Sequence, residues 1–282
     1  MRSVYAALNA WTLPGSLSPV EQLACAAAAG FGGLELVIGS EGVLRPDTAL
    51  EEFRELGQRA ADTGLRIVGL ATSLFWQFNY ASPDEVGRQR AADLTLQMLD
   101  RAAAAGAGAI LVVPAVVGRF DEPRPRVAYT DALHYTFEAL VTLRHQAEAR
   151  VVTLALENVW NRFLLSPVEF CDLIDRVNSP HVGVYLDVGN VLACGYPEDW
   201  IGTLGGRIAR VHAKDYDLAR PGREGFCALG EGSVNWPAVL AALRDAGYDG
   251  PVTYEGPGDP VEIARRLKNI LADCPVKAEE PT

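Results

Sequence analysis

Apolar and polar residues follow two alternating patterns along this chain. Short runs rich in Val, Ile and Leu are separated by longer amphipathic stretches, and the alternation recurs eight times. Short continuous apolar runs are typical of buried parallel strands, and longer periodic stretches are typical of helices. We therefore expect strands at residues 4–9, 33–37, 66–71, 109–113, 151–157, 181–187, 207–212 and 250–255.

Capping residues mark the helix boundaries between these runs. Ser18, followed by Pro19, opens a helix that Gly30 ends, and Ser82 and Ser166, each followed by proline, open two more. The helix from Ser82 is expected to run through an Ala-rich stretch to 106. The remaining helices are expected at about 48–63, 127–150, 198–204, 235–246 and 259–272.

Eight strand–helix pairs in 282 residues predict an α/β protein with a single (β/α)8 TIM barrel. The main alternative is a doubly wound sheet, which ordinarily carries a glycine-rich phosphate loop after its first strand. The stretch at 9–14, Asn-Ala-Trp-Thr-Leu-Pro, is not such a loop. Because no linker rich in Pro, Gly and Ser divides the chain, we expect one barrel domain over 1–276 and a disordered polar tail at 277–282.

The amino-acid composition limits which binding partners and which cellular compartment we expect. The net charge of −11 disfavours nucleic acids and anionic membranes as partners, since clustered Lys and Arg supply most of the affinity for both. The five cysteines are scattered and form no C-x-x-C pair, which favours reduced thiols in a cytoplasmic protein. We find no secretory signal core and no apolar run long enough to span a bilayer. A homo-oligomer is compatible with apolar stripes on outer helices.

Four consecutive expected strands end in a residue that can bind a metal. In a closed barrel all four reach the rim where enzymes of this fold keep their catalytic groups. Three unpaired carboxylates there would cost on the order of several kcal/mol through desolvation and repulsion, and a divalent cation would remove that cost. The predicted metal ligands are Glu157, Asp187, His212 and Glu255.

The ligand types indicate which cation fits. Three carboxylates and one imidazole suit a hard-to-borderline ion, whereas structural zinc usually takes more sulfur and nitrogen. We expect Mn²⁺, with Mg²⁺, Co²⁺ and Zn²⁺ as alternatives. An octahedral ion with four protein ligands would keep two positions for adjacent oxygens of a substrate.

Five motifs surround these residues: Glu157-Asn-Val-Trp160, Asp187-Val-Gly-Asn190, His212-Ala-Lys-Asp215, Leu229-Gly-Glu-Gly-Ser-Val-Asn-Trp236 and Tyr254-Glu255. They resemble the motifs of the sugar phosphate isomerase/epimerase family, which has a xylose isomerase-like TIM barrel. That family includes L-ribulose-5-phosphate 3-epimerases and D-tagatose 3-epimerases. The resemblance implies that the four residues bind the metal and that Glu157 and Glu255 also act as acid and base.

Two positions depart from the free-ketose members of that family. Asn190 stands where those epimerases carry a histidine, as in the pentulose-phosphate branch, and Leu218 stands where they carry an arginine. Arg220 and Arg223 lie close by in the sequence. The substrate is therefore expected to be a ketose or a ketose phosphate, with the choice open.

Charge placement suggests a mechanism. A ketose would chelate the cation, which stabilises the enediolate that forms when a proton leaves the α-carbon. One of Glu157 and Glu255 would take the proton and the other would return it to the opposite face, inverting C3. If one glutamate moved the proton between C1 and C2, the enzyme would be an aldose–ketose isomerase.

Three other functions stay open or are disfavoured. A metal-dependent lyase or dehydratase, or an enzyme that cleaves C-glycosides, would use the same enolate chemistry with a different leaving group. A non-catalytic sugar-binding barrel would have no need for two bases beside a metal. A nuclease with three zinc ions would need several histidines at strand ends, and only His212 is placed so.

Several residues near the expected rim can contact a sugar. Two aromatic side chains can stack on it, two cations can neutralise an oxyanion or a phosphate, and two polar side chains can bind hydroxyl groups. The charged loop at 214–232 is a candidate lid. The predicted substrate-binding residues are Trp160, Trp76, Lys214, Arg220, Asn190 and Glu35.

Overall fold

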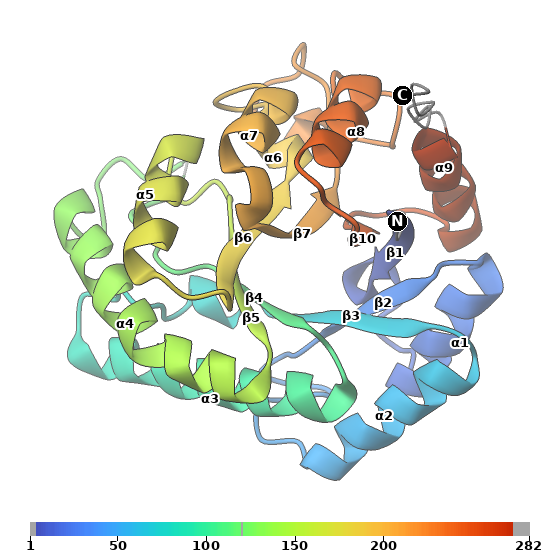
Figure 1. Cartoon of the computed structure of the whole chain (residues 1–282), viewed down its shortest axis with the longest axis horizontal. Coiled ribbons are helices and arrows are strands. Elements are labelled where there is room, and N and C mark those ends of the chain that lie inside the picture. The colour runs from blue at the N-terminus through green and yellow to red at the C-terminus, as the bar shows by residue number, and fades with distance from the viewer. Residues whose placement is uncertain (1–3, 120, 273–282) are drawn as a thin grey trace, which may run out of the picture.

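A closed barrel of parallel strands forms the centre of the structure, a computed structural model that describes residues 4–119 and 121–272. Helices surround this barrel (Figure 1). Within the described residues the strands follow the order β1-β10-β7-β6-β5-β4-β3-β2, so the predicted (β/α)8 TIM barrel is confirmed. The barrel strands are β1 Tyr5–Asn9, β2 Gly33–Val37, β3 Arg66–Ala71, β4 Ala109–Val112, β5 Thr153–Glu157, β6 Val182–Asp187, β7 Ile208–Ala213 and β10 Pro251–Tyr254.

The helices pack an apolar face against the outside of the barrel. Burial of that face is the main source of stability for this layer, and Phe53, Met98 and Phe170 are fully buried in it. None of the described helices has the length and apolar character needed to cross a lipid bilayer. The helices are α1 Pro19–Ala29, α2 Leu50–Asp62, α3 Glu85–Ala105, α4 Tyr129–Arg150, α5 Pro167–Val177, α6 Val188–Val191, α7 Pro197–Leu204, α8 Trp236–Asp245 and α9 Pro260–Ala272.

The predicted helix caps at Ser18 and Ser166 are confirmed, and each forms a capping box with the glutamate three residues later. The predicted cap at Ser82 is wrong. Its hydroxyl accepts a hydrogen bond from the backbone N–H of Asn79 at 2.9 Å and so belongs to the preceding turn. Asp84 caps α3 instead, accepting from the N–H of Gly87 at 2.7 Å.

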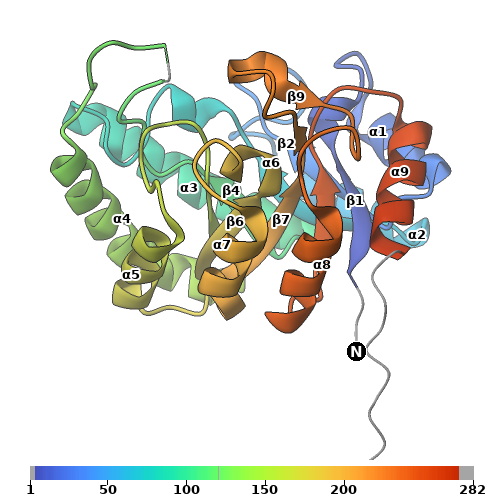
Figure 2. The same cartoon turned by 90° about the horizontal axis from the view of Figure 1, so that it is seen from above.

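A small hairpin interrupts the chain between β7 and α8. It pairs β8 Asp215–Tyr216 antiparallel with β9 Phe226–Cys227. In Figure 2 β9 lies at the carboxyl end of the barrel strands, opposite the start of β1. The predicted lid loop therefore sits on the face where a barrel keeps its site.

Two sequence predictions are only partly covered by the structure. The tail at 277–282, like the domain end at 276, lies outside the described residues, so both stay predictions. Four of the five cysteines lie in the described part of the chain, and each is a free thiol: Cys25, Cys171, Cys194 and Cys227.

Candidate active site

The four predicted metal ligands converge at the carboxyl end of the barrel. Glu157 and Asp187 are the last residues of β5 and β6, His212 lies in β7, and Glu255 directly follows β10. Asp187 and His212 are register partners across the β6–β7 ladder. One ligand atom from each of the four residues lies within 4.8 Å of the others.

The imidazole of His212 lies between two carboxylates on one side and a third on the other. Its Nδ1 is 3.0 Å from Glu157 Oε1 and 3.0 Å from Glu255 Oε2, and its Nε2 is 2.8 Å from Glu35 Oε2. Burial lowers the pKa of His212, but Glu35 and Glu255 raise it more, so this pKa lies well above its ordinary value. In the absence of a cation the ring therefore holds a proton on each nitrogen.

Glu35 does not contact the pocket, so its predicted role in binding sugar hydroxyls is corrected. Its side chain is completely buried behind His212. It also accepts hydrogen bonds from Asn9 Nδ2 at 2.6 Å and from the hydroxyl of Tyr185 at 2.8 Å. A substrate in the pocket would have to pass the imidazole to reach this carboxylate.

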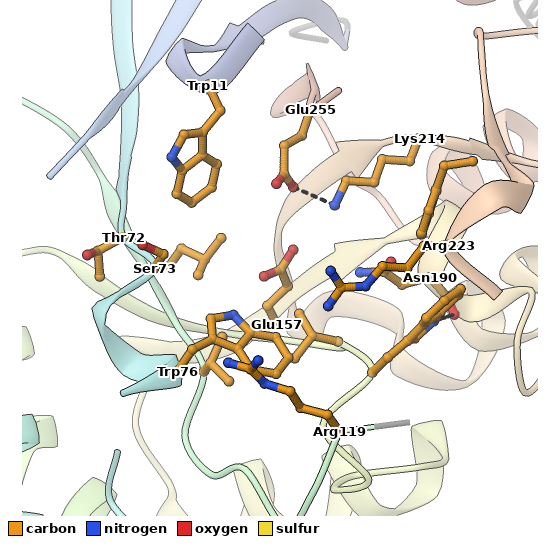
Figure 3. A pocket seen from close by; sticks show the side chains of 15 residues that line it. Trp11, Thr72, Ser73, Trp76, Arg119, Glu157, Asn190, Lys214, Arg223 and Glu255 are labelled. Carbon is orange, nitrogen blue, oxygen red and sulfur yellow. Dashed lines mark hydrogen bonds and ion pairs between the residues drawn. The ribbon is translucent and has the colours of Figure 1, made fainter. Parts of the chain in front are cut away.

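Lys214 supplies a second positive charge to the cluster. Its Nζ lies 2.9 Å from Asp187 Oδ2. It also lies 2.8 Å from Glu255 Oε2, the ion pair drawn as a dashed line in Figure 3. Burial lowers the pKa of Lys214, but Asp187 and Glu255 raise it more, so the pKa lies well above its usual value. The ammonium group stays charged and offsets part of the repulsion between the carboxylates.

Two carboxylate oxygens of the cluster retain capacity for another ligand. Asp187 Oδ2 and Glu255 Oε2 are buried and, among the described residues, accept no hydrogen bond of acceptable geometry, although the Lys214 ammonium lies near both. Buried oxygens without such a partner are uncommon and call for an explanation such as an ion. The three carboxylates and one imidazole fit a divalent cation.

Asn158, which sequence reasoning did not select, holds Asp187 in place. Its side chain accepts a hydrogen bond from Asp187 N at 2.7 Å and donates one to Asp187 O at 2.9 Å. Asp187 Oδ1 accepts from the N–H of Asn190 at 2.9 Å, and the Asn190 amide donates to the Asn158 carbonyl at 3.0 Å. Trp160 Nε1 then donates to the Asn190 carbonyl at 3.2 Å. This network leaves Asp187 Oδ2 facing the cluster.

The two glutamates of the cluster differ in proton affinity. Burial raises the pKa of Glu157 to about 7. Burial also raises the pKa of Glu255, but Lys214 and His212 lower it more, so it falls below its ordinary range. Two carboxyl groups with pKa values pushed apart are suited to act as an acid and a base at one site.

A pocket of about 250 Å³ opens above the cluster. Glu157 and Glu255 both point into it from different sides (Figure 3). The predicted residues Trp76, Trp160, Asn190 and Lys214 all contribute to its wall. The full lining is Trp11, Thr72, Ser73, Trp76, Leu111, Val113, Arg119, Glu157, Val159, Trp160, Asn190, Lys214, Arg223, Phe226 and Glu255.

Arg220 is not brought into this pocket. Its side chain is 70% exposed and pairs with Asp217 at 3.3 Å on the outside of the loop. Arg223, three residues later, lines the pocket instead. Because 222–225 form a short 3₁₀ turn, the two arginines point to different sides.

Sequence reasoning also missed Trp11, Arg119 and Phe226 as pocket residues. Trp11 lies in the short 3₁₀ turn after β1, Arg119 lies in the loop after β4, and Phe226 begins β9. Figure 3 shows Arg119 beside Trp76, and its guanidinium carbon lies 5.8 Å from the centre of that ring. Trp11 and Arg119 both follow the end of a barrel strand. That position could have identified them as pocket residues from the sequence, since loops at this rim face the site.

Asp215 anchors the loop that carries Arg223 and Phe226. Its buried carboxylate accepts hydrogen bonds from Gly230 N at 2.8 Å, Val234 N at 3.2 Å and Trp236 Nε1 at 3.1 Å. A Cβ added at residue 232 would lie 2.2 Å from Asp215 Oδ1, so glycine is required there. The loop is therefore closed on a central acceptor.

We expect Asp215→Asn to loosen this loop. An amide presents one acceptor oxygen and places an NH₂ group against N–H donors, which should lower the free energy of unfolding by about 1–3 kcal/mol. Chemical denaturation measures that change, and trypsin cleavage within the loop should become faster. Asp217→Asn, a more exposed change in the same loop, is the matched control. Equal stability and equal cleavage rates for both variants would refute the anchoring role.

Together the fold and the site define a TIM-barrel protein with a carboxylate–histidine cluster at its carboxyl rim. The chain belongs to the family described as "Xylose isomerase-like TIM barrel", which matches residues 23–274. This membership agrees with the resemblance found in the sequence motifs.

Individual relatives are similar over most of the chain. L-ribulose-5-phosphate 3-epimerase UlaE of Salmonella paratyphi C (strain RKS4594) is 26% identical over 247 residues, which cover 86% of this chain and 84% of that protein. A D-psicose 3-epimerase solved in the presence of D-fructose has a TM-score of 0.76 at 17% identity, covering 95% of this chain and 97% of that one. The 3-keto-D-glucoside 4-epimerase YcjR from E. coli has a TM-score of 0.76 at 16% identity, covering 96% and 100%. The two structures support the fold.

Proposed function

We propose that the protein is a divalent-metal-dependent sugar isomerase that acts on a ketose or ketose phosphate, with 3-epimerisation as its reaction. The observation that carries the proposal is the pair Glu157 and Glu255, which face one pocket from different strands and contact the same nitrogen of His212. Similarity to UlaE, which is named for 3-epimerisation of a ketose phosphate, supports the same reaction class.

Glu157, Asp187, His212 and Glu255 would hold the cation, and the donor set favours Mn²⁺ over Mg²⁺, Co²⁺ and Zn²⁺. When bound, the cation supplies a Lewis acid that stabilises negative charge on a substrate oxygen. Asn158 holds the backbone of Asp187 through two hydrogen bonds. Cytoplasmic location and assembly into a homo-oligomer, both expected from the sequence, stay proposals.

The glutamates would carry the proton transfer. One carboxylate takes the proton from the carbon beside the substrate carbonyl, and the other, in its acid form, returns a proton to the opposite face. In the metal-free protein the pKa values of Glu157 and Glu255 are pushed apart, which supports different proton-transfer roles for the two carboxyl groups. Because each oxygen needed for proton transfer must stay free of other partners, each glutamate would use one oxygen as a ligand and the other as base or acid.

The pocket walls favour a phosphorylated ketose. Trp11, Trp76 and Trp160 offer aromatic faces for a sugar ring or chain. Arg119 and Arg223 extend toward the pocket interior (Figure 3), and guanidinium groups suit bidentate binding of a phosphate. These two arginines lie within an otherwise acidic chain, so they favour binding of an anion in the pocket.

A substrate panel in D₂O tests this function. The Mn²⁺-loaded protein is incubated with ketoses and ketose phosphates, and exchange at each carbon is followed by NMR. Exchange and inversion at C3, lost on chelation of the metal and restored by Mn²⁺, are expected. Exchange at C1 with aldose formation would move the assignment to an aldose–ketose isomerase, and elimination of water or an aglycone would move it to a lyase. Binding without exchange in any substrate would contradict catalysis and favour a sugar-binding barrel.

A further inference from the structure

Two irregularities in the barrel lie at residues that surround His212. The β2–β3 register shifts between Leu34 and Glu35, and the β6–β7 register shifts between Val184 and Tyr185. Shifts of this kind re-aim a side chain and are frequent next to active sites. Here both shifts occur at a residue that points into the barrel toward the same imidazole.

The barrel leaves room for Glu35 at this point. Its register partner across β3 is Gly69, and a Cβ added there would lie 3.1 Å from Glu35 Oε1. A larger side chain would therefore crowd the carboxylate. The absence of a side chain at residue 69 is what permits a completely buried glutamate beside His212.

The buried carboxylate is matched to three donors. Oε2 accepts from Asn9 Nδ2 at 2.6 Å and lies 2.8 Å from His212 Nε2, and Oε1 accepts from the Tyr185 hydroxyl at 2.8 Å. The Tyr185 ring also packs on the imidazole, with ring centres 4.1 Å apart. Because a carboxylate oxygen can only accept, the Nε2 atom of His212 must carry the hydrogen in this contact.

We propose that Glu35 is a positioning residue for the metal ligand His212. By accepting the Nε2 hydrogen, it fixes the tautomer and the ring angle and leaves Nδ1 as the nitrogen that faces the cation. Nδ1 is the atom that lies 3.0 Å from both Glu157 and Glu255. A carboxylate behind a ligating histidine also makes the imidazole a stronger donor to the metal. The inference rests on the proposed metal site.

A purely structural role for Glu35 would show a different signature. Removing a buried hydrogen-bonded group would then lower the free energy of unfolding of the metal-free protein. The affinity of the folded protein for metal would stay unchanged. A positioning role changes the metal affinity itself. The two roles are thus separated by measuring Mn²⁺ binding and unfolding on the same variants.

The decisive variant is Glu35→Gln, with Mn²⁺ binding followed by the EPR signal of the free ion. We expect the Kd for Mn²⁺ to rise about 10–100-fold, the range typical of lost partners behind a ligating histidine. Glu55→Gln, an exposed change on α2, is the matched control and should bind like the unaltered protein. Tyr185→Phe keeps the ring but removes one hydrogen bond to Glu35, and should raise the Kd about fivefold.

NMR of ¹⁵N-histidine in the Zn²⁺-loaded protein supplies a second readout. Nε2 of His212 should carry the hydrogen and Nδ1 should not. The proposal is overturned if Nδ1 carries the hydrogen, or if Glu35→Gln folds and binds Mn²⁺ as tightly as the control. If Glu35→Gln does not fold, unchanged binding by Tyr185→Phe overturns it. Absence of Mn²⁺ binding by the unaltered protein would instead remove the proposed metal site itself.

Discussion

Replacing either Glu157 or Glu255 by glutamine is expected to lower kcat by about 10²–10⁴-fold, the usual contribution of a positioned acid or base. Glutamine keeps an oxygen that can still face a cation, but it neither takes nor gives a proton. Most of the fold should persist, because each change conserves the size of the side chain. Steady-state assays on the substrate identified in the panel measure the loss.

Proton exchange separates the two glutamates further. When one glutamate is replaced, the other can still exchange the C3 hydrogen that it faces for deuterium from D₂O. This exchange occurs in one epimer and without inversion. Each variant should therefore exchange a different epimer. Glu231→Gln, a change on the exposed part of the lid where the side chain pairs with Arg266, is the control and should keep nearly normal turnover. Substantial residual inversion in either Glu157→Gln or Glu255→Gln would rule out this pairing.

The affinity for Mn²⁺ is expected to fall steeply as the pH is lowered. Burial raises the pKa of Glu157 to about 7, and the pKa of His212 is raised well above its ordinary value because Glu35 and Glu255 outweigh its burial. In the metal-free protein both groups bind protons that a cation must displace, so acid favours the metal-free form. The Kd should therefore rise as the pH is lowered, most steeply below about pH 7, where Glu157 also holds a proton that must leave.

Isothermal titration with Mn²⁺ between about pH 6 and about pH 8 measures this change, and the Glu157 proton alone is expected to raise the Kd about tenfold from the higher to the lower pH. Glu157→Gln removes this proton and should make the Kd depend less on pH below about pH 7. A Kd that hardly changes over the same span would show that the cluster does not bind the ion through these groups.

Periodicity and strand ends made most of the fold predictable. The apolar runs of a parallel barrel are continuous because both faces of each strand are buried, so β2 and β3 were placed with the observed bounds. Other boundaries moved by a residue or two, and the cap of α3 moved from Ser82 to Asp84 because Ser82 serves the preceding turn.

The ligand cluster was predictable for the same reason. In a closed parallel barrel the carboxyl ends of all strands meet at one rim, so residues that end successive strands must be neighbours. Glu157, Asp187, His212 and Glu255 needed no loop geometry to be brought together, and the structure places their ligand atoms within 4.8 Å of one another.

What lies beyond the strand ends was decided only by the tertiary structure. Arg220 and Arg223 lie in the same loop, and the sequence gives no reason to prefer either as a pocket residue. The backbone turn between them places Arg220 in solvent and Arg223 in the pocket. Glu35 is polar and lies near the rim, but a register shift and the space beside Gly69 direct it behind His212.

The sequence by itself determined the barrel, the four converging ligands and the class of chemistry. The strands and the residues that end them can be recognised locally in the sequence, and closure of the barrel then brings those residues into contact. The tertiary structure alone decided which positively charged side chains line the pocket. It also decided that Asn158 holds Asp187 and that Glu35 hydrogen-bonds to the imidazole of His212. Those outcomes depend on loop paths and on the space between packed strands, which are set by contacts between residues far apart in the sequence.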